Sequence, residues 1–159
     1  MAIEYDPLLS TEIKKIEDTI KDQYLTFEIN GEDYGIAIAK VKEIIPMQTI
    51  TRVPEMPDYI KGVTNLRGEL IGVLDVRTRF NMPAKEYDES TCIVVIFYQD
   101  YLLGLIVDAV KETATIPETA ISPPPSAKLS FTNQFIHSIG RVGDSVKLLL
   151  DLEKFLEQE

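Results

Sequence analysis

The sequence predicts a mainly β protein made of two copies of one small unit. The first observation is a series of short apolar runs, rich in β-branched and aromatic residues, that are separated by brief polar turns. The second is an internal repeat, in which two stretches of the chain align with two later stretches. Many short strands joined by brief turns indicate small barrels or a sandwich.

One clear helical pattern precedes the β-type runs. Four apolar residues recur there at helical spacing: Leu9, Ile13, Ile16 and Ile20. Ser10 can cap the helix, so residues 1–23 are predicted to form an N-terminal helical extension. Because an isolated helix of this length is only marginally stable in water, we expect the body of the chain to cover the apolar stripe, rather than a neighbouring molecule or a partner.

The β-type runs follow this helix and alternate with turn residues. Asn30 and Gly31 begin one hairpin turn, and Gln99 and Asp100 form another. Residues 60–70 predict a strand, a tight turn and the start of another strand. The remaining predicted strands are 24–29, 34–38, 70–76, 92–97, 102–107 and 146–150.

The internal repeat relates the two halves of the chain. Residues 35–43 align without gaps with residues 104–112, and residues 60–80 align with residues 136–156. We therefore divide the chain into four parts. These are the N-terminal extension at 1–23, a first β-barrel subdomain at 24–80, a connector at 81–90, and a second β-barrel subdomain at 91–159 that ends in a short helix.

Both copies of the repeat place an aspartate between a strand and a helix-like tail. Asp75 precedes residues 76–80, and Asp151 precedes residues 152–156. An aspartate carboxylate accepts hydrogen bonds from the free backbone N–H groups at a helix start. We therefore expect both residues to cap helices rather than to act as acids or bases.

Arg67 departs from the repeat, because its aligned counterpart is Gly143. Asn65 is likewise aligned with Arg141. The shared fold therefore does not itself require an arginine at position 67. This comparison predicts a functional role for Arg67 rather than a structural one.

Composition argues against several classes of function. A net charge of -10 repels nucleic acid and anionic lipid, and no basic cluster offsets it. The longest apolar runs are too short to span a membrane, and no secretory signal is recognisable, so we expect a cytoplasmic protein. The one cysteine, Cys92, lies in an apolar run and is expected to be a small buried hydrophobe.

The sequence contains few residues of the kinds that catalysis requires. His137 is the only histidine, which excludes a site with two histidine ligands within one chain. No phosphate-binding or dinucleotide-binding glycine motif is present. We expect no enzyme activity, no cofactor and no metal; the alternative is a hydrolase that uses His137 with Ser138 or Asp144.

Three motifs in the β-rich region resemble a known family. They are Tyr-Gly-Ile-x-Ile-x-x-Val-x-Glu-Ile at 34–44, Ile-Lys-Gly-Val-Thr-Asn-Leu-Arg-Gly at 60–68, and Val-Leu-Asp-Val-Arg at 73–77. In this order they resemble the CheW family of coupling proteins in bacterial chemotaxis. The resemblance implies one CheW-like domain at 24–157, composed of two SH3-like five-stranded β-barrel subdomains, in agreement with the repeat.

The resemblance also implies an adaptor function without catalysis. Members of this family join the cytoplasmic tip of chemoreceptors, the methyl-accepting chemotaxis proteins, to the regulatory domain of the histidine kinase CheA and control its autophosphorylation. We therefore expect the chain to work at membrane-associated receptor arrays, with possible assembly into rings with CheA. The alternative is a CheW-like scaffold that binds kinase regulatory domains without receptor coupling.

Carried over to matching positions, the resemblance implies a receptor-binding groove between the subdomains. Apolar groove residues would contact a receptor helix, although they can equally be core residues, and a glycine there can serve a bulge alone. Glu43 and Arg67 would orient the helix by charge-assisted hydrogen bonds or pair with each other. The implied residues are Val41, Glu43, Ile44, Gly62, Asn65, Arg67, Val107 and Val110.

A kinase-binding surface is implied in two further segments. One is the connector, and the other is the loop that contains three consecutive prolines. Prolines fix the shape of a loop and reduce the entropy lost on docking, but such a run can equally be a rigid connector. The implied residues are Met82, Tyr87, Ser122, Pro124 and Ala127.

Overall fold

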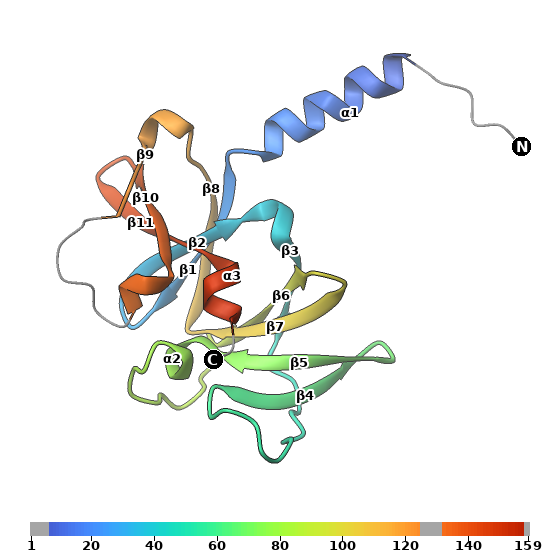
Figure 1. Ribbon diagram of the computed structural model, residues 1–159, viewed down its shortest axis with the longest axis vertical. Coiled ribbons are helices and arrows are strands. Elements are labelled where there is room, and N and C mark those ends of the chain that lie inside the picture. The colour runs from blue at the N-terminus through green and yellow to red at the C-terminus, as the bar shows by residue number, and fades with distance from the viewer. Residues whose placement is uncertain (1–6, 125–131, 158–159) are drawn as a thin grey trace, which may run out of the picture.

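The computed structural model describes residues 7–124 and 132–157, and most of its regular structure is β-strand (Figure 1). The helices are α1 (Pro7–Ile20), α2 (Val76–Arg79) and α3 (Leu152–Leu156), with 3-10 helices η1 (Ile38–Lys40), η2 (Glu118–Ala120) and η3 (Thr132–Phe135). The strands are β1 (Gln23–Ile29), β2 (Glu32–Ala37), β3 (Val41–Pro46), β4 (Ile60–Leu66), β5 (Glu69–Asp75), β6 (Cys92–Tyr98), β7 (Tyr101–Val107), β8 (Ala109–Thr115), β9 (Ile121–Ser122), β10 (Ile136–Val142) and β11 (Ser145–Leu150). The predicted mainly β fold with an N-terminal and a short C-terminal helix is confirmed.

The strands form two sheets of the same topology. One has the order β8-β1-β2-β11-β10-β9, and the other has the order β3-β6-β7-β5-β4. In each sheet the chain that leaves the first edge strand crosses to the opposite edge. Thr51 forms a bridge with Val63 of β4, and β9 pairs with β10 at the equivalent place. Each sheet therefore curls toward a closed barrel.

Each sheet combines strands from both halves of the chain. The hairpin β1–β2 of the first half lies with β8, β10 and β11, and the hairpin β6–β7 of the second half lies with β3, β4 and β5. Parallel pairing of β2 with β11 and of β5 with β7 joins each hairpin to its host sheet. The segments 24–80 and 91–159 therefore do not coincide with the two sheets. A hairpin forms its turn locally but can complete either sheet, so the sequence repeat alone does not reveal this exchange.

A large hydrophobic core lies between strands of both sheets, and each sheet adds a smaller cluster. Strand β6 shows the arrangement. Val94 and Ile96 belong to the large core, whereas Ile93 and Val95 belong to the cluster of the five-stranded sheet. Because successive side chains of a strand point to opposite faces, both faces of β6 are covered, which explains its continuous apolar run.

Both predicted aspartate caps are present, whereas the predicted Ser10 cap is wrong because α1 begins at Pro7 and Ser10 lies within it. Asp75 Oδ1 accepts hydrogen bonds from the backbone N–H groups of Arg77 (2.9 Å) and Thr78 (3.4 Å) at the start of α2. Asp151 Oδ1 accepts one from the N–H of Lys154 (3.2 Å) at the start of α3. The prediction that these aspartates cap short helices after a strand is confirmed.

Helix α1 points away from the two sheets (Figure 1). Its apolar side chains remain accessible, with Ile16 60% exposed and Leu9 53% exposed. The expectation that the body of the chain covers this stripe is therefore wrong for this structure. In the described part of the chain, no helix has the length and apolar character needed to cross a membrane.

Candidate functional site

Arg67 lies in the two-residue turn between β4 and β5. Arg67 has φ 51° and Gly68 has φ 86°, so both residues adopt the left-handed conformation that tight hairpin turns of this kind require. The equivalent turn of the second copy has Gly143 with φ 58° at the position of Arg67. A residue with a Cβ atom is less stable than glycine in this conformation by about 1–2 kcal/mol, so the turn itself favours glycine.

The Arg67 side chain reaches across to Glu43 on β3. Arg67 Nη1 donates to Glu43 Oε1 at 2.7 Å, and Nη2 donates to Oε2 at 2.8 Å. This bidentate pair connects the β4–β5 turn to the opposite edge strand of the same sheet. The hydrogen bonds from Arg67 lower the pKa of Glu43, so its carboxylate stays ionised to lower pH.

The pair combines an exposed cation with a more sheltered anion. The Arg67 side chain is 66% exposed, whereas that of Glu43 is 24% exposed. A guanidinium has five N–H donors, and Glu43 uses two of them. Arg67 therefore retains donors that point to solvent and are fixed in direction by the Glu43 pair.

A bulge in β3 places Glu43 on the opposite face of the sheet from its apolar neighbours Val41 and Ile44. The pairing of β3 with β6 shifts between Val41 and Glu43, after which Glu43 lies opposite Val95 and Ile44 lies opposite Val94. Glu43 and Ile44 therefore point to opposite faces of the sheet. Ile44 is 44% exposed, while Val41 is partly buried against the large core.

Two further apolar residues implied for the groove lie where β7 ends and β8 begins. Val110 lies opposite Phe27 of β1 and is partly buried against the large core, as Val41 is. Val107 is 1% exposed and is a member of that core. Of the apolar residues implied for the groove, Ile44 therefore offers the most surface, Val41 and Val110 offer part of theirs, and Val107 lies beneath.

Gly62 and Asn65 serve the local backbone. Gly62 has φ 144°, and a Cβ atom there would lie 2.0 Å from the carbonyl oxygen of Thr51. The close approach is thus made by the chain itself, where the Thr51 bridge closes the sheet. Asn65 Oδ1 accepts a hydrogen bond from the N–H of Gly68 (2.8 Å), which fixes the turn that presents Arg67.

The two connector residues implied for kinase binding are tied to the body. Met82 packs, partly buried, against the large core. Tyr87 is 45% exposed, and its hydroxyl donates to Asp75 Oδ2 at 2.7 Å. Burial, followed by the hydrogen bond to Asp75, raises the pKa of Tyr87, so its hydroxyl remains a donor. The same aspartate therefore caps α2 and anchors the connector.

The proline-rich segment is only partly described. Ser122 is exposed on β9 and lies opposite Ile139, and Pro124 is half-buried. Ala127 lies outside the described residues.

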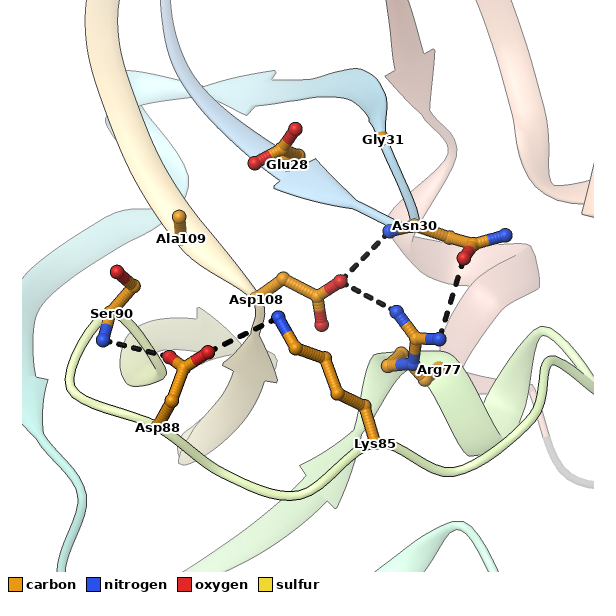
Figure 2. Close-up of a pocket in the computed structure, with 9 residues that line it drawn as sticks. All are labelled: Glu28, Asn30, Gly31, Arg77, Lys85, Asp88, Ser90, Asp108 and Ala109. Atoms are coloured by element: carbon orange, nitrogen blue, oxygen red, sulfur yellow. Dashed lines mark hydrogen bonds and ion pairs between the residues drawn. The ribbon is translucent and has the colours of Figure 1, made fainter.

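A polar cleft of about 450 Å³ was missed by sequence reasoning (Figure 2). Arg77 Nη1 donates to Asp108 Oδ2 at 2.6 Å, and the same oxygen accepts from the N–H of Asn30 at 2.8 Å. Arg77 also donates through Nε to the carbonyl oxygen of Pro83 (3.0 Å). The Arg77 and Asp108 side chains are only 12% and 11% exposed. This network joins α2 to the β1–β2 turn and the β7–β8 junction, so it links the two sheets.

The repeat contained a signal for this network. Asp108 aligns with Ala39, and Arg77 aligns with Glu153. The buried ion pair of Arg77 and Asp108 is therefore replaced, at the equivalent place in the other sheet, by Ala39 and the exposed Glu153. Because Arg77 belongs to the first copy and Asp108 to the second, the alignment marks each charge as an exception but does not pair the two, and the exchange of hairpins brings them together.

Of the residues of the hydrolase alternative, His137 and Ser138 lie within hydrogen-bond distance of each other on β10. The His137 ring lies 3.1 Å from Ser138 Oγ, its neighbour on β10, and Ser138 is 5% exposed. Burial raises the pKa of Cys92, which keeps this half-buried thiol protonated.

Comparisons with known proteins agree on one family. The model of the CheW-like domain matches residues 23–159. "Chemotaxis protein CheW" of Klebsiella aerogenes is 34% identical over 151 residues, which are 95% of this chain and 91% of that protein. "Chemotaxis protein CheW" of Bacillus subtilis is 34% identical over 138 residues, covering 87% and 88% of the two chains. The crystal structure of the scaffolding protein TtCheW from Thermoanaerobacter tengcongensis superposes with a TM-score of 0.80 at 31% identity, covering 87% of this chain and 94% of that chain.

Proposed function

This chain belongs to the CheW-like domain family, and we propose that it is a non-catalytic adaptor in chemotaxis. In this proposal it couples the cytoplasmic tip of chemoreceptors to the histidine kinase CheA and controls CheA autophosphorylation. It acts in the cytoplasm at membrane-associated receptor arrays, and assembly into rings with CheA is part of the proposal. Neither a cofactor nor a metal takes part.

The observation that supports the proposal is the presentation of Arg67. An arginine occupies a left-handed turn position that favours glycine, and Glu43 holds it in a fixed direction. A residue that is unfavourable for its turn, yet well positioned and exposed, is typical of a binding residue. Exposed donors of a fixed guanidinium suit the carboxylates or carbonyl oxygens of a receptor helix.

The other implied receptor-binding residues fit around this pair in two ways. Val41, Ile44 and Val110 supply apolar surface for the helix. The remaining residues would act through support, with Gly62 and Asn65 shaping the backbone and Val107 filling the core beneath. For the kinase we propose the surface of Met82, Tyr87, Ser122, Pro124 and Ala127.

The test measures autophosphorylation of the cognate CheA in receptor-containing membranes, with and without this protein. We expect the wild type to raise kinase activity only when receptor is present. Arg67→Gly removes the guanidinium while keeping the turn, so it should bind CheA and fail to couple. The matched control, Arg141→Ala, removes an exposed arginine from the equivalent hairpin and should couple normally.

Two results would change the proposal in different ways. If the wild type binds CheA but has no effect with receptor present, the chain is a kinase scaffold without receptor coupling. If Arg67→Gly couples as well as the wild type, the adaptor function stands and the receptor-binding residues lie elsewhere.

A further inference from the structure

Helix α1 carries an apolar seam, which we define as Leu9, Ile13, Ile16 and Ile20. Leu9, Ile13 and Ile16 are 53%, 47% and 60% exposed, and the helix points away from both sheets (Figure 1). Exposed apolar side chains in one line are unfavourable in water unless a partner covers them. This seam takes no part in the adaptor surface proposed above.

The spacing of the seam is that of a coiled-coil helix. Successive seam residues are four, three and four positions apart, which corresponds to d, a, d and a of two heptads. Such a seam fits against one other helix with the same pattern. It is narrower than the apolar face of a helix that packs on a globular core.

Carboxylates border the seam on both sides. In the same register Glu12 occupies a g position and Glu17 an e position, the two kinds of position beside the contact line. The other charged side chains of α1, Lys14, Lys15 and Asp18, fall at the b, c and f positions, away from the contact line. A partner helix would therefore face acidic borders only.

These borders argue against two other occupants. In a pair formed with a second copy of α1, carboxylates would face carboxylates in either orientation, since the charged residues at e and g are both glutamates. An anionic lipid surface would likewise be repelled by the borders and by the chain's net charge of -10. A basic helix, in contrast, is attracted by the acidic borders and by the negative net charge of the chain.

We propose that the α1 seam binds an amphipathic helix of a partner protein whose own apolar seam is bordered by lysine or arginine. The adaptor surfaces proposed above use other residues, so this contact is additional to the adaptor function and does not depend on it. A seam of two heptads forms a weak contact by itself. It becomes effective when the partner is also held nearby, because tethering raises the effective concentration.

The test uses the full chain and two synthetic helical peptides of three heptads, with isoleucine at a and leucine at d. The basic probe has lysine at every e and g position, and the acidic probe has glutamate there. Binding is measured by fluorescence anisotropy of labelled peptide at about 0.15 M ionic strength. We expect the basic probe to bind about tenfold more tightly than the acidic probe.

Two neighbouring residues provide a matched pair of variants. Glu17→Lys and Asp18→Lys change the net charge equally, but only position 17 borders the seam. Glu17→Lys should weaken binding of the basic probe about fivefold and strengthen binding of the acidic probe, whereas Asp18→Lys should change both by less than about twofold. Ile13→Ser should abolish binding of both probes while leaving the thermal unfolding of the barrels unchanged.

Several results would overturn the proposal. Equal binding of both probes, equal effects of Glu17→Lys and Asp18→Lys, or no binding of either probe would exclude a basic partner helix. Dimerisation of the wild type that Ile13→Ser abolishes would make a second copy the occupant. Loss of barrel stability in Ile13→Ser would indicate packing on the body, and α1-dependent binding to phosphatidylglycerol vesicles would indicate a lipid surface.

Discussion

Arg67 combines an unfavourable backbone conformation with an exposed ion pair. The left-handed turn position favours glycine, and the pair with Glu43 adds little stability because it is exposed to solvent. The two contributions therefore act in opposite directions. The stability of the fold therefore does not explain the arginine, which leaves recognition as its role in the proposed function.

We expect Arg67→Gly to leave the free energy of unfolding within about 1 kcal/mol of the wild type, because relief of the turn offsets the lost pair. Urea denaturation followed by circular dichroism measures this directly. A loss of more than about 2 kcal/mol would make Arg67 a structural residue and would remove the argument for its role in binding.

Asp33 and Lys147 form a second, more buried ion pair. Lys147 is 3% exposed, and its Nζ atom donates to Asp33 Oδ2 at 2.7 Å, while Lys111 approaches Asp33 Oδ1 at 3.3 Å. The position of Lys147 is occupied in the other copy by Ile71, which is 1% exposed. The hydrogen bond from Lys147 lowers the pKa of Asp33 despite its partial burial.

This lowered pKa predicts a pH dependence of stability. Because the pKa of Asp33 is lower in the folded than in the unfolded chain, its contribution is present above the ordinary aspartate value of about 4 and is lost as pH falls through the folded value. Asp33→Asn should lower the free energy of unfolding by about 1–2 kcal/mol at neutral pH. The gap to the wild type should narrow below pH of about 4; a gap that stays constant to pH of about 3 would contradict the assignment.

The short helices α2 and α3 begin in the same way but depend on their caps to different degrees. Asp75 accepts from two backbone N–H groups and from Tyr87, and it is 6% exposed. Asp151 accepts from one backbone N–H group and is half-buried. In the first copy the cap therefore also orders the connector.

Substitution of the two caps should separate these roles. Asp151→Ala should lower the free energy of unfolding by about 1 kcal/mol, the usual contribution of an N-cap. Asp75→Ala should cost about 2–3 kcal/mol, because the Tyr87 hydroxyl also loses its partner. Tyr87→Phe keeps the α2 cap, so its free energy of unfolding in chemical denaturation should lie between those of Asp75→Ala and the wild type. If Asp75→Ala and Asp151→Ala lose the same free energy, the Tyr87 hydrogen bond adds no stability.

At the scale of the whole molecule, the exchanged hairpins make the two sheets interdependent. Each sheet lacks two of its strands unless the other half of the chain is present. The large core contains residues of both sheets, and the Arg77–Asp108 pair fastens their junction. We therefore expect the two halves to unfold as one unit.

Arg77→Ala tests how much the Arg77–Asp108 pair stabilises the junction of the two sheets. Removing one member of a buried ion pair leaves the other uncompensated, so the free energy of unfolding should fall by about 3 kcal/mol. Arg141→Ala, at an exposed position, should change it by less than about 0.5 kcal/mol. Both variants should unfold in a single transition by calorimetry; two separate transitions would contradict the interdependence of the sheets.

Strands with a clear apolar pattern and turns with specific chemistry were predictable, whereas strands with mixed patterns were not. The apolar runs of β6 and β7 and the Asn30-Gly31 turn identify their elements locally. Strands β3 and β8 were missed because each carries Lys-Glu within a short segment and exposes much of its length. Their edge positions tolerate these charges, and an edge position is set by the sheet.

By itself the sequence determined the mainly β class, the repeat, the two aspartate caps and the exceptional position of Arg67. Periodicity and turn chemistry are properties of nearby residues, and the alignment between the two copies needs only a comparison along the chain, so none of these features requires knowledge of packing. Only the tertiary structure decided that the hairpins exchange, that Glu43 pairs with Arg67 and that Val107 is buried. These outcomes depend on which distant segments pack together, because packing energy is shared among many contacts and no single stretch of sequence encodes it.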